Sequence, residues 1–257
     1  MRILKKAPPL WGAFLFIGLW IPNLYAACSM PSSAQRVQVA HVYDGDTVRL
    51  TDGRRIRLIG INTPETEKEG IPAEPYAKEA KSRLEGILAG ADIKLLPGRQ
   101  SYDRYKRNLA YLFADGALVS EMLIEEGLGH YVAIPPNTRF LGCLSDAEAI
   151  ARKKGEALWS EPVRDVAALH SGESGFRLLR GRVAAVKTIK TGYILEIESQ
   201  LAIKISKETS LLFDQSLEKL LGREVEVRGW IRPKSAKAPK HYLPWFMQLT
   251  HPAQLRI

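Results

Sequence analysis

The chain has 257 residues, of which 46% are hydrophobic and 25% are charged, and its formal net charge is +9. This composition is ordinary for a globular protein, and the sequence shows no internal repeat or low-complexity tract, which excludes a repeat architecture. The length is sufficient for two small domains. The charge is unevenly spread, because residues 28–175 have a net charge of −2 whereas residues 176–257 have a net charge of +8.

The first 27 residues are typical of a secretory signal peptide. Three basic residues among the first six precede the apolar run PLWGAFLFIGLWIPNLYAAC, which ends in small residues. The uninterrupted apolar stretch, residues 10–21, is short for a membrane span, and an uncleaved N-terminal anchor is the alternative interpretation. We expect cleavage after Ala26 or Ala27 and a protein that is periplasmic or secreted.

Cys28 and Cys143 are the only cysteines of the chain. An exported protein meets oxidising conditions, so we expect the two to form a disulfide. A bridge that closes so long a loop adds about 4 kcal/mol of stability in the chain-entropy model. The alternative is two independent thiols with Cys28 lipidated, although Tyr25 stands where lipoprotein signals usually carry leucine.

The hydrophobic pattern of residues 36–160 predicts a small antiparallel barrel with about three helices. Val37, Val39, Val48 and Leu50 alternate with polar residues as in half-buried strands, and TDGR at 51–54 predicts a hairpin turn. RIRLIGI is the returning strand, and NLAYLFADG is a later strand that runs into a turn. Helices are expected at 74–89, at LVSEMLIEEGLG and at SDAEAIARKKGEALW, where Ser145 and Glu148 have capping-box spacing.

Residues 161–175 are mixed in composition and are expected to form a linker. Beyond it, residues 176–257 predict a second, OB-like barrel domain, since five strands with a helix between the third and fourth follow the OB-fold order. The predicted strands are 177–187, 192–198, 200–205, 224–231 and 244–249, and the predicted helix is 208–221. The expected fold class is therefore mainly β with helices (α+β), with two barrels.

Three acidic residues around the first hairpin indicate a site for a hard cation. Asp44 and Asp46 flank Gly45, and the hairpin should return Asn62, Thr63 and Glu65 to the side of Asp46. Hard cations such as Ca²⁺ take carboxylate, carbonyl and water oxygens as ligands. Taken alone, the DGD tripeptide is more typical of a surface turn than of a metal site.

Two arginines complete a set of residues suited to phosphodiester hydrolysis. Arg57 lies among apolar residues on the returning strand, and Arg107 immediately precedes another strand. Guanidinium groups bind phosphate in two places at once and can stabilise charge that develops on a five-coordinate phosphorus. Glu65 is placed to accept a proton from an attacking water molecule.

Residues 37–159 resemble the staphylococcal nuclease (thermonuclease) family through VYDGDTVRL, RLIGINTPE, DRYKRNLAYLFADG, EGLG and GEALW. The resemblance covers about half of the chain. It implies an OB-type barrel with helices, Ca²⁺ dependence, and hydrolysis of DNA and RNA that leaves 3′-phosphate ends. By position it implies that Arg57, Glu65 and Arg107 are catalytic; that Asp46, Asn62 and the Thr63 carbonyl bind the metal; and that Asp44 reaches the metal through water.

Two positions depart from the family pattern. Asn62 stands where the best-known member has aspartate, which keeps a carbonyl ligand but removes one negative charge and should weaken cation binding. Lys106 stands where glycine is common before the catalytic arginine, so a positive φ at this position would strain the backbone.

The basic C-terminal part is expected to help hold a polyanion. Its WIRPKSAKAPKHYLPW segment interleaves basic residues with aromatic ones, a pattern that suits single-stranded nucleic acid. The alternative is that Trp230 and Trp245 belong to the core and that the lysines only solubilise a loop. The residues predicted to bind nucleic acid are Tyr131, Arg232, Lys234, Lys237, Lys240 and Tyr242.

Other polar residues are assigned no chemistry. The five histidines show no metal-binding spacing and are expected to be structural or exposed, and Glu67, Glu69 and Glu74 are expected on a solvated loop near the site.

Together these observations predict an exported, Ca²⁺-dependent nuclease with DNA and RNA as substrates and no stable protein partner. A membrane tether is expected only if the N-terminus stays uncleaved or Cys28 is lipidated. The alternative function is a catalytically weak or inactive nucleic-acid-binding or interaction protein that keeps the barrel, and Asn62 is the residue that favours it.

Overall fold

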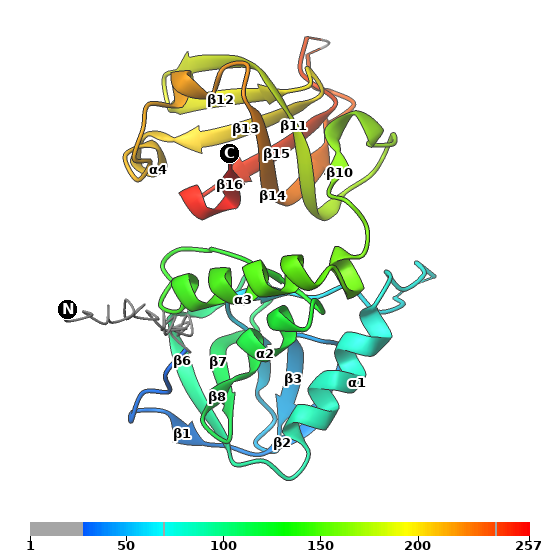
Figure 1. Ribbon diagram of the computed structural model, residues 1–257, viewed down its shortest axis with the longest axis vertical. Helices are drawn as coiled ribbons and strands as arrows, with labels where there is room; N and C mark the ends of the chain where they lie inside the picture. The colour runs from blue at the N-terminus through cyan, green and yellow to red at the C-terminus, as the bar shows by residue number, and fades with distance from the viewer. Residues whose placement is uncertain (1–27, 69, 240) are drawn as a thin grey trace, which may run out of the picture.

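The computed structural model describes residues 28–68, 70–239 and 241–257. These residues form two seven-stranded β-sheets and a small two-stranded one; each large sheet has its own hydrophobic core, one in the lower and one in the upper half of Figure 1. The predicted signal peptide falls on residues 1–27, which lie outside the described residues. Within the described part of the chain, no helix has the length and apolar character needed to cross a membrane.

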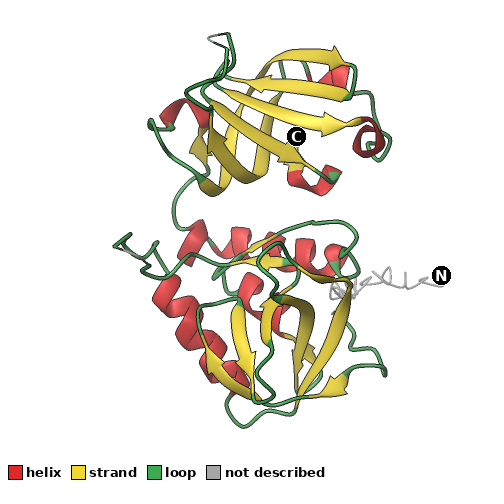
Figure 2. Cartoon of the chain, turned by 180° about the vertical axis from the view of Figure 1, so that it is seen from behind, coloured by secondary structure: helices red, strands yellow, loops and turns green. Residues whose placement is uncertain are grey.

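The first half is a barrel flanked by helices (Figure 2), because β1 and β2, which follow one another in the chain, lie at the two ends of one sheet. Its strand order is β1-β6-β7-β4-β3-β2, with β8 paired to β7 and with β4 and β7 parallel. The elements are β1 (Gln35–Arg36), β2 (Val39–Val42), β3 (Thr47–Leu50), β4 (Arg55–Leu58), β5 (Ile61–Asn62), α1 (Ala77–Leu88), β6 (Ile93–Tyr102), β7 (Asn108–Ala114), β8 (Ala117–Leu118), α2 (Val119–Glu125), β9 (His130–Tyr131), α3 (Leu141–Lys154) and the 3-10 helix η1 (Ala157–Trp159).

The second half closes into a five-stranded barrel. Its sheet order is β10-β11-β12-β13-β15-β14-β16, and a further pairing of β11 with β14 joins the ends. The elements are β10 (Arg164–Asp165), η2 (Val166–Ala168), β11 (Gly175–Ile189), β12 (Gly192–Ile197), β13 (Leu201–Ser206), α4 (Lys207–Ser210), η3 (Leu217–Leu220), β14 (Glu224–Pro233), β15 (Trp245–Leu249), η4 (Pro252–Gln254) and β16 (Leu255–Arg256). The predicted fold class, mainly β with helices, is confirmed.

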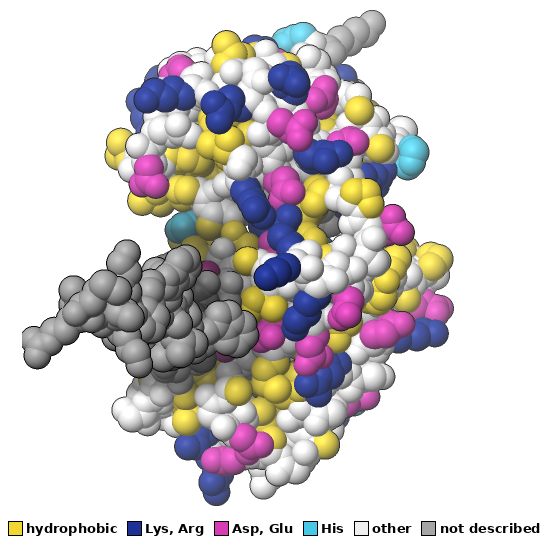
Figure 3. Space-filling view, in the orientation of Figure 1, with side chains coloured by type: hydrophobic (Ala, Val, Ile, Leu, Met, Phe, Trp, Pro, Cys, Tyr) yellow, Lys and Arg dark blue, Asp and Glu magenta, His cyan; other side chains and the backbone are white. Residues whose placement is uncertain are grey.

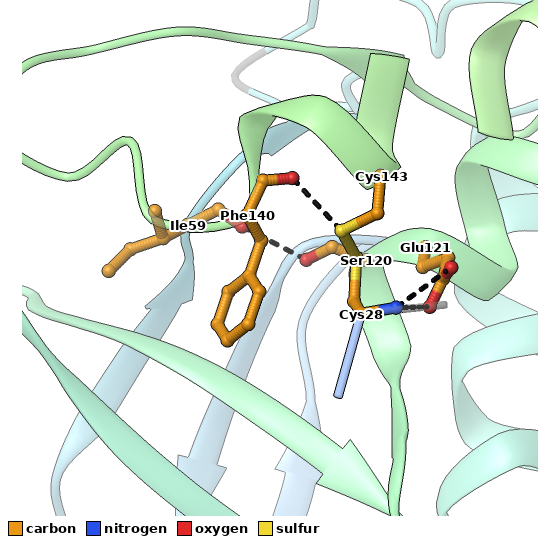
Figure 4. Close-up of a disulfide and its surroundings, with 6 residues drawn as sticks. All are labelled: Cys28, Ile59, Ser120, Glu121, Phe140 and Cys143. Carbon is orange, nitrogen blue, oxygen red and sulfur yellow. Dashed lines mark hydrogen bonds between the residues drawn. A yellow bond between two sulfur atoms is a disulfide. The ribbon is translucent and has the colours of Figure 1, made fainter. Parts of the chain in front are cut away.

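The disulfide between Cys28 and Cys143 is present, as predicted, and joins the start of the described chain to α3 (Figure 4). Helix α3 begins at Leu141, after Phe140, and not at the predicted capping box. Phe140 packs edge-on against the Tyr111 ring at 4.8 Å between centroids, so the helix is anchored one turn before Ser145.

Two other sequence predictions need correction. The predicted linker is folded, because Val166 and Leu169 are buried in the second core and β10 pairs with β11. The predicted helix 208–221 is reduced to α4 and η3, which are separated by a turn. Leu211 and Leu212 are 85% and 55% exposed, so the leucines that suggested one long apolar face do not pack together.

A buried ion pair joins the two halves. The Arg228 guanidinium on β14 contacts both carboxylate oxygens of Glu148 on α3, at 2.6 and 2.7 Å. Arg228 also donates to the Tyr131 carbonyl at 3.1 Å, and its guanidinium lies 4.1 Å from the Tyr131 ring centroid. Burial opposes the charge of Glu148, but the hydrogen bonds and charge of Arg228 outweigh it and hold the pKa of this carboxyl below its usual value.

Candidate active site

The loop between β2 and β3 turns sharply at Gly45 because the neighbouring structure leaves no room for a side chain. A Cβ at this position would lie 2.8 Å from the Ala80 Cβ on α1 and 2.8 Å from the Thr63 side chain. Asp44 Oδ1 accepts a hydrogen bond from the Asp46 backbone N–H at 3.0 Å, which fixes the turn. The glycine thus lets the turn that carries the two acidic residues pack closely against α1 and Thr63.

Asp46 is the buried centre of the site. It is 5% exposed, and its Oδ2 accepts from the Thr63 N–H at 3.0 Å and pairs with Arg57 Nη2 at 2.9 Å. Its Oδ1 accepts from the Thr47 hydroxyl at 3.0 Å. The hairpin therefore returns Asn62 and Thr63 to the side of Asp46, as the sequence predicts.

Arg57 is held in one place by acceptors from its own strand and from the turn that follows. It donates to the carbonyls of Leu58 at 2.7 Å and Ile61 at 2.9 Å, and to Asn62 Oδ1 at 3.2 Å. With Asp46, this makes four contacts on a side chain that is 12% exposed. The positive charge is thus fixed before any substrate binds.

Arg107 approaches the same region from the start of β7. Its Nε pairs with Asp103 at 2.7 Å, and its Nη1 lies 3.5 Å from the Thr47 hydroxyl, which itself bonds to Asp46. Lys106 has φ of +61°, in the left-handed region, so the strain anticipated from its lysine side chain is present. The turn built by Asp103 tolerates that strain and places Arg107 beside Thr47.

Glu65 lies on the exposed rim, on the loop that leaves β5. Its backbone N–H donates to Glu74 Oε2 at 3.0 Å, and its carbonyl accepts from the Glu74 N–H at 2.9 Å. Partial burial and then the charge of Asp46 raise the pKa of Glu65, whereas Arg57 and Arg107 act in the opposite direction. Glu65 is therefore within electrostatic reach of Asp46 and of both guanidinium groups.

The oxygen atoms around Asp46 fit a hard cation. Burial, followed by the charge of Asp46, raises the pKa of Asp44 to about 6, so the two carboxyls are crowded in a way that a cation would relieve. Asn62 Oδ1 and the Thr63 carbonyl add neutral oxygens at the same end of the hairpin. The donor set contains only oxygen, which suits Ca²⁺.

Not all of the residues predicted to bind nucleic acid are exposed. Tyr131 is 8% exposed, and its hydroxyl donates to the Ala253 carbonyl at 2.9 Å, so the predicted stacking role is not supported by the structure. The Arg228 guanidinium lies against the Tyr131 ring, where a base would otherwise stack. Arg232, Lys234, Lys237 and Tyr242 lie exposed on the second half, far along the chain from Asp46, and Lys240 lies outside the described residues.

Three contacts around the site could not be predicted from the sequence. Glu74, expected to be solvated, bonds to the Glu65 backbone and also pairs with Arg177 Nη1 at 3.3 Å. His130 lies opposite Asn62 in the β5–β9 ladder. These contacts join residues far apart in the chain, and a single acid, arginine or histidine carries no periodic signal that would reveal them.

Comparisons with known proteins agree with this geometry. The family described as "Staphylococcal nuclease homologue" matches residues 55–161. The chain is 34% identical over 132 residues to "Thermonuclease" of Staphylococcus hyicus, covering 50% of this chain and 78% of that protein. It is 36% identical over 124 residues to "Thermonuclease" of Staphylococcus intermedius, covering 47% and 74%. It is 29% identical over 130 residues to "Endonuclease YncB" of Bacillus subtilis (strain 168), covering 49% and 62%.

Proposed function

This chain belongs to the staphylococcal nuclease family and is a nuclease that hydrolyses phosphodiester bonds, and from that premise we propose that the reaction takes place beside Asp46. In this proposal Glu65 is the general base, and Arg57 and Arg107 stabilise the phosphorane. The observation that supports the proposal is that three hydrogen bonds and one ion pair hold the Arg57 guanidinium in place. A charge that is fixed in advance stabilises a transition state without reorganisation.

The residues divide the work by their environment. Arg57 is enclosed and immobile, so it suits a phosphate oxygen whose charge grows during attack. Arg107, which contacts Asp103, Thr47 and the Tyr105 ring, is less enclosed and suits the leaving side of the phosphate. Glu65 is exposed, so a water molecule can reach it, and its raised pKa makes it a better proton acceptor than an ordinary surface glutamate.

We further propose that the site uses Ca²⁺, held by Asp46, the Asn62 side-chain oxygen and the Thr63 carbonyl, with Asp44 acting through water. When bound, such a cation neutralises phosphate oxygens and lowers the cost of charge on the phosphorane. Asn62 contributes no charge to this set. Asn62→Asp is therefore expected to lower the Ca²⁺ concentration that half-activates the enzyme, by about tenfold if the added charge is worth about 1.4 kcal/mol. A titration of activity against Ca²⁺ measures this, and an unchanged midpoint would count against Asn62 as a ligand.

The substrates proposed are DNA and RNA, with products that end in a 3′-phosphate. We propose that the second half assists by contacting the polyanion through Arg232, Lys234, Lys237 and Tyr242, which are exposed. On the face seen in Figure 3, Lys and Arg side chains are spread over this half and along the boundary between the halves, intermixed with acidic ones. That pattern suits weak contacts along a backbone more than a single deep binding site.

Export is also part of the proposal. The Cys28–Cys143 disulfide supports it, since structural disulfides persist where the environment is oxidising. Fractionation of cells that express the full chain, with detection of the shortened mature form, tests this point.

The main experiment compares Glu65→Gln with Glu67→Gln in the full chain, on denatured DNA with Ca²⁺ and again with a chelator. Glu67 is an exposed acid on the same loop, so it controls for charge. Loss of a general base should slow cleavage by about 10² to 10⁴-fold, whereas the control should stay within about twofold. Full activity of Glu65→Gln, or cleavage that survives the chelator, would overturn the proposed mechanism.

A further inference from the structure

Two adjacent residues at the start of β11, Phe176 and Arg177, contact residues that adjoin the proposed active site. Arg177 Nη1 lies 3.3 Å from Glu74 Oε1, and the Phe176 ring stacks on the His130 ring with centroids 5.8 Å apart and an interplanar angle of 29°. Both residues belong to the second half and lie beyond residues 55–161, which match the family. The contacts are therefore made by a part of the chain that the family match does not include.

The contact through Arg177 reaches Glu65 by one intermediate. Glu74 uses one carboxylate oxygen to accept from the Glu65 N–H and the other to pair with Arg177. Its own N–H donates to the Glu65 carbonyl. Both backbone groups of Glu65 thus depend on Glu74, so the orientation of Glu74 decides where the Glu65 side chain begins.

Arg177 is itself firmly placed. Its Nε donates to Glu173 Oε1 at 2.9 Å, and Glu173 also pairs with Arg164 at 2.5 Å. Although partial burial opposes it, these hydrogen bonds hold the pKa of Glu173 at about 2. The Trp245 indole N–H donates to the Glu173 carbonyl at 3.2 Å, which ties the group to the second core. Arg177 is therefore a fixed support and not a free surface side chain.

The contact through Phe176 leads to the β5–β9 ladder, which carries Asn62. His130 pairs with Asn62 in the β5–β9 ladder, and its ring lies between Phe176 and Trp159, whose centroid is 5.0 Å away. Asn62 in turn bonds to Arg57. One dipeptide of the second half thus supports both the strand that carries Asn62 and the loop that carries Glu65.

We propose that Phe176 and Arg177 are positioning residues for catalysis, with Arg177 acting on the general base through Glu74 and Phe176 acting on the Asn62 strand through His130. This inference rests on the proposed role of Glu65. The second half is then a brace for the reaction centre, whatever it contributes to substrate binding. A misplaced base lowers the rate of the chemical step, while the substrate still binds.

The test measures kcat and KM for full-chain variants in the presence of Ca²⁺ on two substrates of different length, long denatured DNA and a thymidine tetranucleotide. Arg177→Ala should lower kcat by about tenfold on both substrates and leave KM within about twofold. Arg177→Lys keeps the charge and should recover part of the loss. Arg180→Ala is the matched control, since Arg180 lies on the same strand and pairs with Asp165 instead.

Three results would overturn the inference. One is a kcat for Arg177→Ala close to that of the parent while Glu65→Gln is inactive, which leaves the proposed function standing. Another is an equal loss in Arg177→Ala and Arg180→Ala, which would indicate a general effect of charge or stability. The third is a loss seen only as a higher KM on long DNA, which would make Arg177 a substrate contact. Full activity of Glu65→Gln would instead remove the proposed function, and this inference with it.

Discussion

The two barrels of this protein share one topology but differ in what they do with it. In chain order, the strands of the first barrel are β2, β3, β4, β6 and β7, and those of the second are β11, β12, β13, β14 and β15. Both sheets place them in the order first, second, third, fifth, fourth, with the third and fifth parallel. Helical segments separate the third strand from the fourth in each.

The first barrel gathers the buried Asp46 and Arg57 at the end of its hairpin. Asp46 at the start of its second strand meets Arg57 near the end of its third, at 2.9 Å. In the second barrel the third strand continues into α4, and the basic residues after β14 stay exposed. The same topology thus carries the proposed reaction centre in one half and its proposed support in the other, and the difference lies in a few side chains at strand ends.

The largest effect on stability is expected where the two barrels meet. Arg228→Met leaves the buried Glu148 carboxylate with Arg152, at 3.0 Å, as its remaining ion-pair partner, and we expect the free energy of unfolding to fall by about 3 kcal/mol. Chemical denaturation of the full chain measures this. Arg180→Met, which removes an exposed pair, should leave the free energy of unfolding nearly unchanged. A loss that is equally small for Arg228→Met would show that the halves are held by other contacts.

The second prediction concerns the buried charge that distinguishes the first barrel. Arg57→Lys should lower kcat by about 10² to 10³-fold, because an ammonium group cannot satisfy two carbonyls, Asn62 and Asp46 at once. Steady-state kinetics with denatured DNA test this. Arg55→Lys, on the same strand but exposed over the Tyr43 ring, should be nearly silent. Similar losses in both variants would mean that the strand, and not the guanidinium position, had been disturbed.

Acid should loosen the contact between the barrels through His130. Burial lowers its pKa to about 4, with Glu148 opposing this shift and Arg228 and Arg152 adding to it. The unfolded chain takes up this proton near pH 6.5, so the stabilising contribution is present above pH 6.5 and is lost as the pH falls towards 4. We expect a loss of about 1–3 kcal/mol over this range.

Denaturation curves at several pH values test this prediction. His130→Leu should flatten the dependence between pH 6.5 and 4, whereas His170→Leu, on an exposed turn, should leave it unchanged. If the parent and His130→Leu lost stability in parallel, another group would be responsible.

The smallest effects are expected in the exposed segment of the second barrel. Arg232→Ala and Lys237→Ala should each weaken binding of single-stranded DNA modestly and reduce the slope of log affinity against log salt by about 1. Binding is measured with a chelator present, so that cleavage does not interfere. Lys187→Ala, a basic residue already paired with Glu196, is the control. An unchanged slope in both variants would remove this segment from the binding surface.

Much of the site could be predicted because its geometry is local. The Asp-Gly turn at 52–53 sets the hairpin, and the hairpin alone brings Thr63 back to Asp46. The Gly45 bend follows from the same short stretch. The cysteine pairing was predictable for a different reason, because the chain has two cysteines, each with one possible intramolecular partner, and is expected to be exported.

What escaped prediction depends on contacts between distant residues. The capping-box spacing of Ser145 and Glu148 was real as a pattern, but Glu148 is used for Arg228, 80 residues away. The leucine pattern of residues 208–221 suggested a helix face, yet no surface of the second core meets Leu211. Tyr131 is predicted to bind nucleic acid, but Arg228 on β14 lies against its ring.

Helix α3 ties three parts of the molecule together. Cys143 fixes the N-terminal end of the described chain to it, and Glu148, five residues further on, fixes the second barrel. A pulling force applied between the N-terminal segment and the C-terminal barrel would therefore converge on little more than one turn of this helix. Mechanical unfolding should begin with rupture of the ion pair, while the covalent link to Cys143 keeps the first barrel closed.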